Sequence, residues 1–297
     1  MVAMKREGWV AIASIPVVLV AASIAGWAGS VGVGTVLGLP TFAALYALAF
    51  LIQWLVFVPS YLLRSERFFD ITGSLTYISV TAIAVVLSTP VDARSALLLG
   101  LVVVWAARLG AFLLRRVLRA GKDARFDRIK RSFARLLLTW TLQGLWVSLT
   151  LAATLAAITT SVRRPLGIPA FVGLALWLVG LGFEALADAQ KARFRSNPVH
   201  RNEFIRTGLW KWSRHPNYFG EILLWTGIAL IAAPVLSGWR WATMISPVFV
   251  ALLITRISGI PMLEKRADEK WGGRDDYETY KRRTSVLIPR PPRREDS

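Results

Sequence analysis

The sequence predicts an all-α protein, a polytopic bundle of about seven to eight transmembrane helices with both termini in the cytoplasm. Three observations favour this fold class. Of the 297 residues, 55% are hydrophobic and the mean hydropathy is +0.49, which is too apolar for a soluble domain of this length. The apolar residues form runs of about 20, the length that crosses a bilayer as a helix. The basic residues lie between these runs and concentrate in alternate connections.

About eight apolar runs follow one another along the chain, and each predicts one spanning helix. The first run is too long for the apolar core of a signal peptide and lacks a clear small-residue cleavage site, so we expect it to be a retained span. The expected spans are residues 9–28, 41–62, 71–87, 96–114, 136–158, 168–186, 218–233 and 241–257.

The charges of the connecting segments predict the topology. The connections after the first, third, fifth and seventh runs carry few charges, whereas segments 108–135 and 191–214 and both terminal regions are basic. By the positive-inside rule the basic segments face the cytoplasm. A net charge of +18 would suggest a nucleic-acid partner in a soluble protein. In a membrane protein, the positive-inside topology and contact with anionic lipid headgroups explain this positive charge, so we expect no nucleic-acid partner.

Composition also limits the chemistry and the domain organisation. The chain has no cysteine, which excludes disulfides, thiolate nucleophiles and cysteine-based metal sites, and we expect no bound metal. No internal repeat of the kind found in transporters is visible. We therefore expect a monomer with one membrane domain over residues 1–289, followed by a disordered basic tail over residues 290–297.

Polar residues in or beside the apolar runs are candidates for function, because burying them in hydrocarbon is costly unless they pair or line a wet cavity. Hydrogen bonds between helices explain Gln53 and Gln143 more simply than ligand contact does. Packing likewise explains Tyr77. These positions alone do not predict chemistry.

Arg108 favours a functional anionic partner. It precedes Arg115 and Arg119 by seven and eleven residues, which places the three on about one face of a helix that leaves the membrane on the cytoplasmic side. Snorkelling toward the headgroups explains Arg115 and Arg119 equally well. Arg108 lies about one to two turns deeper.

The stretch 184–225 holds the densest set of candidate functional residues and both histidines of the chain. On a helix, Glu184, Asp188, Lys191 and Arg195 form one stripe of alternating charge at the cytoplasmic mouth of the bundle. The alternative explanation is a salt-bridged helix face between headgroups.

A second helix is predicted to begin within the same stretch. Proline suits the first turn of a helix, so Pro216 predicts a helix start whose N–H groups offer a seat for phosphate. Asn217 and Glu221 lie one turn apart on this helix and share a face. A phosphate-bearing cofactor with ribose or amide groups would meet these side chains and nearby arginines together. The alternative is a capping role, with pairing to Arg214.

The C-terminal region mixes acidic and basic residues with tyrosines. Arg256 lies near the membrane, and Tyr277 and Tyr280 precede a basic triplet. A solvated amphipathic helix explains this composition. So does a lid that covers a nucleotide by stacking on its base and pairing with its phosphates.

Several motifs resemble one family. The segment GLWKWSRHPNYFGEILLWTGIAL, with RFFDITGSLTYI and WAARLGAFLLRRVLRAGKDARFD before it and SGIPMLE after it, resembles the bacterial membrane family DUF1295. That family is related to the steroid 5-alpha-reductases and sterol reductases, and more remotely to isoprenylcysteine carboxyl methyltransferases. The resemblance covers residues 70–289 and is most specific in its NYFGE core.

The resemblance implies a membrane-embedded reductase. It would use NADPH from the cytoplasm to reduce a conjugated carbon–carbon double bond of a steroid-, sterol- or isoprenoid-like lipid taken from the bilayer. In steroid reductases an aspartate, an arginine seven residues later and an N-x-x-G-E motif contact NADPH. Together with looser matches, the implied cofactor contacts in this sequence are Arg108, Asp188, Arg195, His215, Asn217, Tyr218, Glu221, Arg256 and Tyr280.

Two departures from the family concern the substrate. Trp105 stands where the steroid reductases have a tyrosine that polarises the 3-ketone, and their partner glutamate has no clear equivalent, the candidates being Phe57 and Gln53. A 3-oxo-steroid substrate therefore does not follow from the resemblance. We expect Gln53 and Trp105 to contact substrate and Tyr77 to act as the catalytic proton donor or polariser.

Two other functions stay open at this point. An S-adenosylmethionine-dependent methyltransferase acting on a lipid or isoprenyl substrate is motivated by RHPNY and by Glu264 followed by Tyr277, Tyr280 and an Ile-Pro pair. A non-enzymatic lipid-binding membrane protein would need neither cofactor. Titration of the protein with NADPH and with S-adenosylmethionine distinguishes the reductase, the methyltransferase and the lipid-binding protein.

Overall fold

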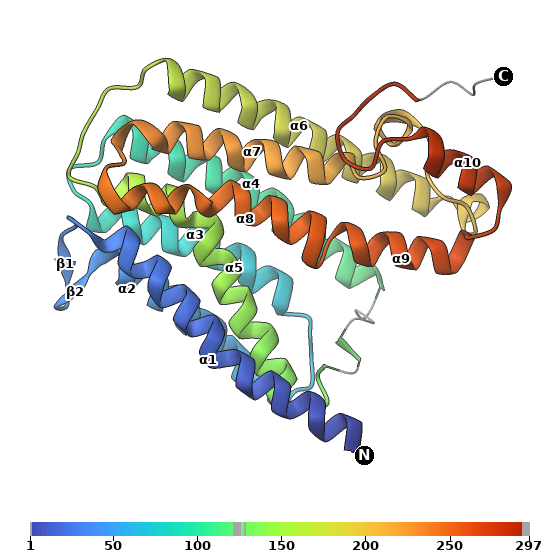
Figure 1. The fold of residues 1–297 in the computed structure, drawn as a ribbon, viewed down its shortest axis with the longest axis horizontal. Helices are drawn as coiled ribbons and strands as arrows, with labels where there is room; N and C mark the ends of the chain where they lie inside the picture. Colours follow the sequence, from blue (N-terminus) through green and yellow to red (C-terminus); the bar gives the residue numbers. More distant parts are fainter. Residues whose placement is uncertain (1, 121–125, 128, 293–297) are drawn as a thin grey trace. The chain divides into compact units, whose positions relative to one another are not determined.

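The fold is almost entirely helical in the computed structural model, which describes residues 2–120, 126–127 and 129–292 (Figure 1). Within the described residues, eight helices are long and apolar enough to cross a membrane. The chain is an integral multi-pass membrane protein, and the predicted all-α polytopic bundle is confirmed. The cytoplasmic location of the termini stays a prediction.

The chain divides into two compact units. Unit 1 comprises Met1–Ala170 and Ala229–Ser246, and unit 2 comprises Phe171–Ile228 and Pro247–Ser297. The helices α6, α7 and α8 each carry a few residues of unit 1 at one end. The prediction of one domain over residues 1–289 stays a prediction.

Unit 1 contains the first five long helices, a short hairpin and the 3-10 segments η4 and η5. Their bounds are α1 Val2–Ser30, β1 Thr35–Val36, β2 Leu39–Pro40, α2 Thr41–Leu62, α3 Phe69–Leu87, α4 Ala93–Ala120, α5 Phe133–Thr159, η4 Ala233–Val235 and η5 Gly238–Met244. The hairpin is antiparallel, with Thr35 opposite Pro40 and Val36 opposite Leu39. It lies in the uncharged first connection.

Unit 2 contains most of the remaining helices. Their bounds are α6 Ile168–Ser196, η2 Pro198–His200, η3 Gly208–Lys211, α7 Pro216–Ala232, α8 Ile245–Leu252, η6 Leu253–Ile257, α9 Ile260–Trp271 and α10 Asp275–Arg283. The start of α7 at Pro216 confirms the helix start predicted from the sequence.

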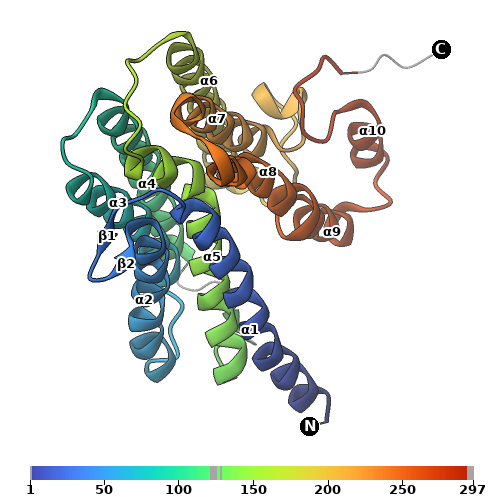
Figure 2. The same ribbon diagram turned by 60° about the vertical axis from the view of Figure 1, so that its left-hand side comes forward.

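Helix α5 is the centre of unit 1. The helices α1, α2, α3 and α4 all pack against it, and α1 runs beside it in both ribbon views (Figures 1 and 2). Its second half is rich in alanine and threonine and is buried on all sides. Small side chains allow this, because they let neighbouring helices approach closely in lipid. The Ser132 side chain caps its start by accepting a hydrogen bond from the Arg135 N–H.

Two arginines are buried at helix ends in unit 1. Arg240 is 3% exposed and donates to the Ala156 carbonyl near the C-terminus of α5. Arg94 is 2% exposed and donates to the Ile231 carbonyl near the end of α7. The last carbonyl groups of a helix have no partner within the helix, so these guanidinium groups supply one. From the sequence alone, both arginines are recognisable only as charged residues in connections that carry few charges.

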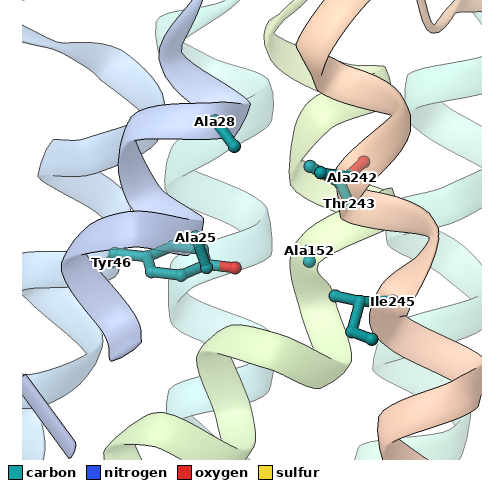
Figure 3. Close-up of a pocket in the computed structure, with 7 residues that line it drawn as sticks. All are labelled: Ala25, Ala28, Tyr46, Ala152, Ala242, Thr243 and Ile245. Atoms are coloured by element: carbon teal, nitrogen blue, oxygen red, sulfur yellow. The ribbon is translucent and has the colours of Figure 1, made fainter. Parts of the chain in front are cut away.

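A small cavity lies inside unit 1 beside α5 (Figure 3). Its volume is about 20 Å³, enough for about one water molecule. The Tyr46 hydroxyl has no hydrogen-bond partner among the described residues, and in Figure 3 it points toward Ala152 and Ile245. The lining residues are Ala25, Ala28, Tyr46, Ala152, Ala242, Thr243 and Ile245. A cavity of this size does not hold a lipid.

Two elements differ in form from the expected ones. The last span, expected over residues 241–257, consists of η5, α8 and the π-helical η6, and it breaks before α9. Gly259 precedes α9 with a non-helical backbone, and Pro261 lies in the first turn of α9, where its missing N–H costs no helical hydrogen bond. The amphipathic C-terminal segment forms two helices, α9 and α10, because Gly272 and Gly273 interrupt it and Gly273 has φ 81°.

Two predictions fall partly outside the described residues. Helix α4 carries Arg108 and Arg115 on one continuous helix, as predicted, but the side chain of Arg119 lies outside the described part of the chain. The tail that we predict to be disordered begins at residue 290. Its residues 293–297 also lie outside the part of the chain that the structure describes.

Candidate functional site

Helices α6 and α7 lie side by side and touch through their backbones (Figures 1 and 2). A Cβ atom at Gly220 would lie 2.4 Å from the Gly180 carbonyl oxygen, and one at Gly227 would lie 2.4 Å from that of Gly173. On each helix the two glycines are about two turns apart and share a face. The missing side chains therefore bring the polar end of α6 against the start of α7.

Asp188 and Asn217 meet at this junction. Asn217 Nδ2 donates to Asp188 Oδ1 at 3.3 Å, and Asp188 is buried. Glu184, one turn earlier on α6, is buried as well. A carboxylate beside an amide offers both acceptors and donors, which suits a ligand with hydroxyl or amide groups.

His215 caps the start of α7. Its carbonyl oxygen accepts the Phe219 N–H at 3.2 Å. Its ring Nε2 lies 2.7 Å from Glu264 Oε1, and Arg214 Nη1 lies 2.7 Å from Glu264 Oε2. Burial lowers the pKa of His215 below its usual value, although the contact with Glu264 acts in the opposite direction. One carboxylate of α9 therefore holds two consecutive side chains at the start of α7.

An aromatic ring and a helix break lie beside the cluster of Arg214, His215 and Glu264. The Tyr218 ring stacks on the His215 ring, with centroids 5.7 Å apart and planes inclined by 16°. A Cβ atom at Gly259 would lie 3.1 Å from the Tyr218 ring and 2.6 Å from the Ile254 carbonyl oxygen. Gly259 follows the π-helical turn η6, and such turns are frequent at functional sites.

The segment after α10 holds the loop that precedes α7. Ser213 and Ser285 form a parallel bridge, and the Arg214 N–H donates to the Ser285 carbonyl at 2.8 Å. The buried Ser213 hydroxyl donates to the Leu287 carbonyl at 2.7 Å and accepts the His215 N–H at 3.1 Å. The C-terminal segment thus fixes the backbone that carries Arg214 and His215.

Trp210 joins three elements of unit 2. Its indole N–H donates to the Ala187 carbonyl at 3.1 Å, and the Lys191 ammonium lies 4.3 Å from its ring centroid. The Tyr280 hydroxyl donates to the Trp210 carbonyl at 2.7 Å. Burial raises the pKa of Tyr280, so this hydroxyl stays protonated at neutral pH. Tyr280, a predicted cofactor contact, is therefore engaged in holding the loop before α7.

Tyr280→Phe is expected to lower the free energy of unfolding by about 1 kcal/mol, because it removes one buried hydrogen bond and leaves the Trp210 carbonyl unsatisfied. Thermal melting of the detergent-purified protein measures the effect. Tyr61→Phe is a matched control, since its ring packing with Phe133 is retained. Equal melting temperatures for Tyr280→Phe and the wild type would contradict the assignment.

The predicted cofactor residues of unit 2 differ in accessibility. Asp188 and His215 are buried, and Asn217, Tyr218, Glu221 and Tyr280 are half-buried. Arg195 and Arg256 are exposed. Unit 2 therefore brings Asp188 to Asn217 and His215 to Tyr218.

The predicted substrate and catalytic residues belong to unit 1. Gln53 is fully buried and donates to the Thr76 hydroxyl at 2.8 Å. The Tyr77 and Trp105 rings are buried and meet edge to face, with centroids 5.0 Å apart. Arg108 is half-buried on α4. The roles assigned to these residues stay predictions.

Three contributors to the cluster in unit 2 are not among the NADPH contacts that the resemblance implies. Glu264 lies 49 residues from His215, its partner. Lys191 was placed on the charged stripe of α6, and Trp210 was one of 13 tryptophans. The stripe of alternating charge could have identified Lys191 as a candidate. For Glu264 and Trp210 the partner is reached only through the tertiary fold.

Comparison with known proteins identifies the family. The family described as "Protein of unknown function (DUF1295)" matches residues 56–284. The chain belongs to this family. This member is also similar to 3-oxo-5-alpha-steroid 4-dehydrogenase 1 of Bos taurus, with 29% identity over 117 residues. That match covers 39% of this chain and 40% of the relative, so it spans about two fifths of the relative's length. No solved structure matches the chain.

Proposed function

We propose that this protein is an NADPH-dependent reductase of a conjugated carbon–carbon double bond in a steroid-, sterol- or isoprenoid-like lipid, with its cofactor site facing the cytoplasm. The Asp188–Asn217 pair at the start of α7 carries the proposal. The similarity to 3-oxo-5-alpha-steroid 4-dehydrogenase 1 supports it, since that relative is named as a dehydrogenase of a lipid.

The residues of unit 2 suit the chemistry of a dinucleotide phosphate. Its phosphates need cations, and Lys191, Arg195 and Arg214 lie on or beside the two helix ends. Its ribose hydroxyls and carboxamide need acceptors and donors, and the Asp188–Asn217 pair offers both. His215 Nδ1 is a buried polar atom without a hydrogen-bond partner among the described residues, as expected where a ligand supplies the missing partner.

The protein's own contribution would be orientation and exclusion of water. NADPH supplies a hydride when bound. Asp188 and Asn217 orient the cofactor, while the basic residues bind its phosphates. The apolar helices would exclude water from the lipid substrate. In this proposal Gln53 and Trp105 contact the substrate and Tyr77 supplies or stabilises a proton. Anionic headgroups are the expected neighbours of the basic surface.

NADPH binding to the detergent-purified protein tests the proposal. Energy transfer from the 13 tryptophans to bound NADPH reports the affinity. Asn217→Ala and Asp188→Asn are each expected to weaken binding about tenfold or more, because the first removes the amide group and the second removes the charge of the carboxylate that accepts from it. Asn202→Ala is the matched control, since Asn202 is exposed and its contacts to Trp271 and Arg274 use its backbone carbonyl.

The outcomes separate the candidate functions. Binding of S-adenosylmethionine in preference to NADPH would favour the methyltransferase, and binding of neither, with lipid co-purifying, would favour a lipid-binding protein. Unchanged NADPH affinity in both site variants would exclude the proposed site. For the reaction, mass spectrometry of membrane lipids with and without the protein should reveal a lipid whose mass rises by two hydrogens.

A further inference from the structure

Glu264 determines which nitrogen of His215 carries a proton. Its Oε2 lies 2.7 Å from the Arg214 guanidinium, so the group is an ionised carboxylate that only accepts hydrogen bonds. Its Oε1 lies 2.7 Å from His215 Nε2. Nε2 must therefore carry the hydrogen of this contact in both the neutral and the charged ring.

The other ring nitrogen, Nδ1, is the informative atom. The side chain of His215 is 6% exposed, and Nδ1 has no hydrogen-bond partner among the described residues. Arg214 and Lys191 face the ring with positive charge, and Glu264 faces it with negative charge. Burial is the largest influence and keeps the pKa of His215 below its usual value, so the ring is neutral at neutral pH.

A neutral ring with its proton on Nε2 has a bare lone pair on Nδ1. A buried acceptor without a donor is unfavourable, so this atom calls for a hydrogen-bond donor from outside the described chain. Hydroxyl and amide N–H groups are such donors. The ring is held from both sides, by Glu264 at Nε2 and by stacking with Tyr218, so the direction of the lone pair is set before a ligand arrives.

We propose that Nδ1 of His215 accepts a hydrogen bond from a ribose hydroxyl or carboxamide N–H group of the bound dinucleotide, with Glu264 fixing the tautomer. This inference rests on the proposed function and makes it more specific. It assigns Glu264 as a positioning residue, which acts on this contact through His215.

Two variants of His215 separate a ligand contact from a purely structural role. In His215→Asn the side-chain amide reaches the position of Nδ1 but not that of Nε2. In His215→Gln the amide reaches toward Nε2 and leaves the position of Nδ1 apolar. With NADP⁺ as the probe, His215→Gln is expected to weaken binding about tenfold, and His215→Asn by no more than about threefold. A structural role through Glu264 predicts the reverse order.

The pH dependence of NADP⁺ binding by the unsubstituted histidine gives a second readout. A ligand that donates to Nδ1 competes with a proton for the same lone pair. Affinity is therefore full above the pKa of the free ring and falls as the pH drops through it, at a value below about 6.5. His215→Asn lacks this component, so the ratio of its dissociation constant to that of the wild type should fall toward acid pH. Titration of the ligand phosphate is common to both proteins and cancels.

His200→Asn is the matched control, because the only other histidine of the chain stacks on Phe194 at 4.3 Å. It is expected to bind NADP⁺ with wild-type affinity and wild-type pH dependence. Wild-type protein that binds no NADP⁺ would overturn both the proposed function and this inference. Binding that is lost equally in both His215 variants, or that has the same pH profile in wild type and His215→Asn, would overturn this inference alone. If the His215 variants do not fold, the pH profile of His200→Asn decides after correction for titration of the ligand phosphate, and affinity that does not fall toward the lowest pH at which the protein stays folded rejects the contact.

Discussion

Gly220→Val is expected to destabilise unit 2 strongly. A Cβ atom at this position would lie 2.4 Å from the Gly180 carbonyl oxygen and 2.6 Å from the Glu184 backbone nitrogen. Both atoms belong to the α6 backbone, so no side-chain rotation relieves the contact and α6 and α7 must separate. Association of helices in lipid depends on such close packing, and overpacking costs about 1–3 kcal/mol or more. Separation would also part Asp188 from Asn217.

Folded yield and thermal melting in detergent measure this effect, and NADPH binding reports the site. Gly182→Ala, on the facing helix α6, is the control, because a Cβ atom at Gly182 would meet nothing within 4 Å. Alanine is the better helix former, so this control should be neutral or slightly stabilising. Wild-type melting of Gly220→Val would show that the two helices do not depend on contact at this position.

Arg240→Ala is expected to destabilise unit 1 by about 3 kcal/mol. The change leaves the Ala156 carbonyl and the Thr159 hydroxyl at the end of α5 without their donor and opens a void where a 3% exposed side chain lay. Because Arg240 is buried in protein, water does not readily replace the lost bonds, which makes the loss larger than at an exposed surface. Denaturant titration of the purified protein measures it.

The matched control for Arg240 is Arg164→Ala. Arg164 also lies in a connection of unit 1, but its side chain is exposed. Removal of an exposed arginine is expected to change stability by no more than about 0.5 kcal/mol. If Arg240→Ala melted like Arg164→Ala, the helix-capping role of Arg240 would be wrong.

The number and nature of the helices follow from local sequence. A run of about 20 apolar residues must satisfy its backbone internally in lipid, and a helix does this without any partner. The expected spans therefore match the helices, and Pro216 marks the start of α7 because proline suits the first helical turn. Charge spacing likewise placed Glu184, Asp188 and Lys191 on one helix, α6.

Local sequence was less informative where an element's form depends on its surroundings. The break between η6 and α9 lies at Gly259, which packs closely against Ile254 and the Tyr218 ring. Within the expected span over residues 241–257 the helix changes form, from the 3-10 segment η5 through α8 to the π-helical η6, and the hydropathy of the run does not distinguish these forms. The motif residues Asp188, Asn217 and His215 could be selected from their spacing and family resemblance, but not their partners.

By itself the sequence determined the class of this protein, an all-α membrane bundle of the DUF1295 family, and most of the candidate cofactor residues. Those features depend on hydropathy, periodicity and motif, which are local along the chain. Only the tertiary structure decided that Glu264 holds His215 and Arg214, that Asn217 faces Asp188 and that Arg240 caps α5. These contacts join residues 29 to 84 positions apart. Their formation depends on which elements approach one another in the fold, and for Asp188 and Asn217 the glycine packing of α6 on α7 allows that approach.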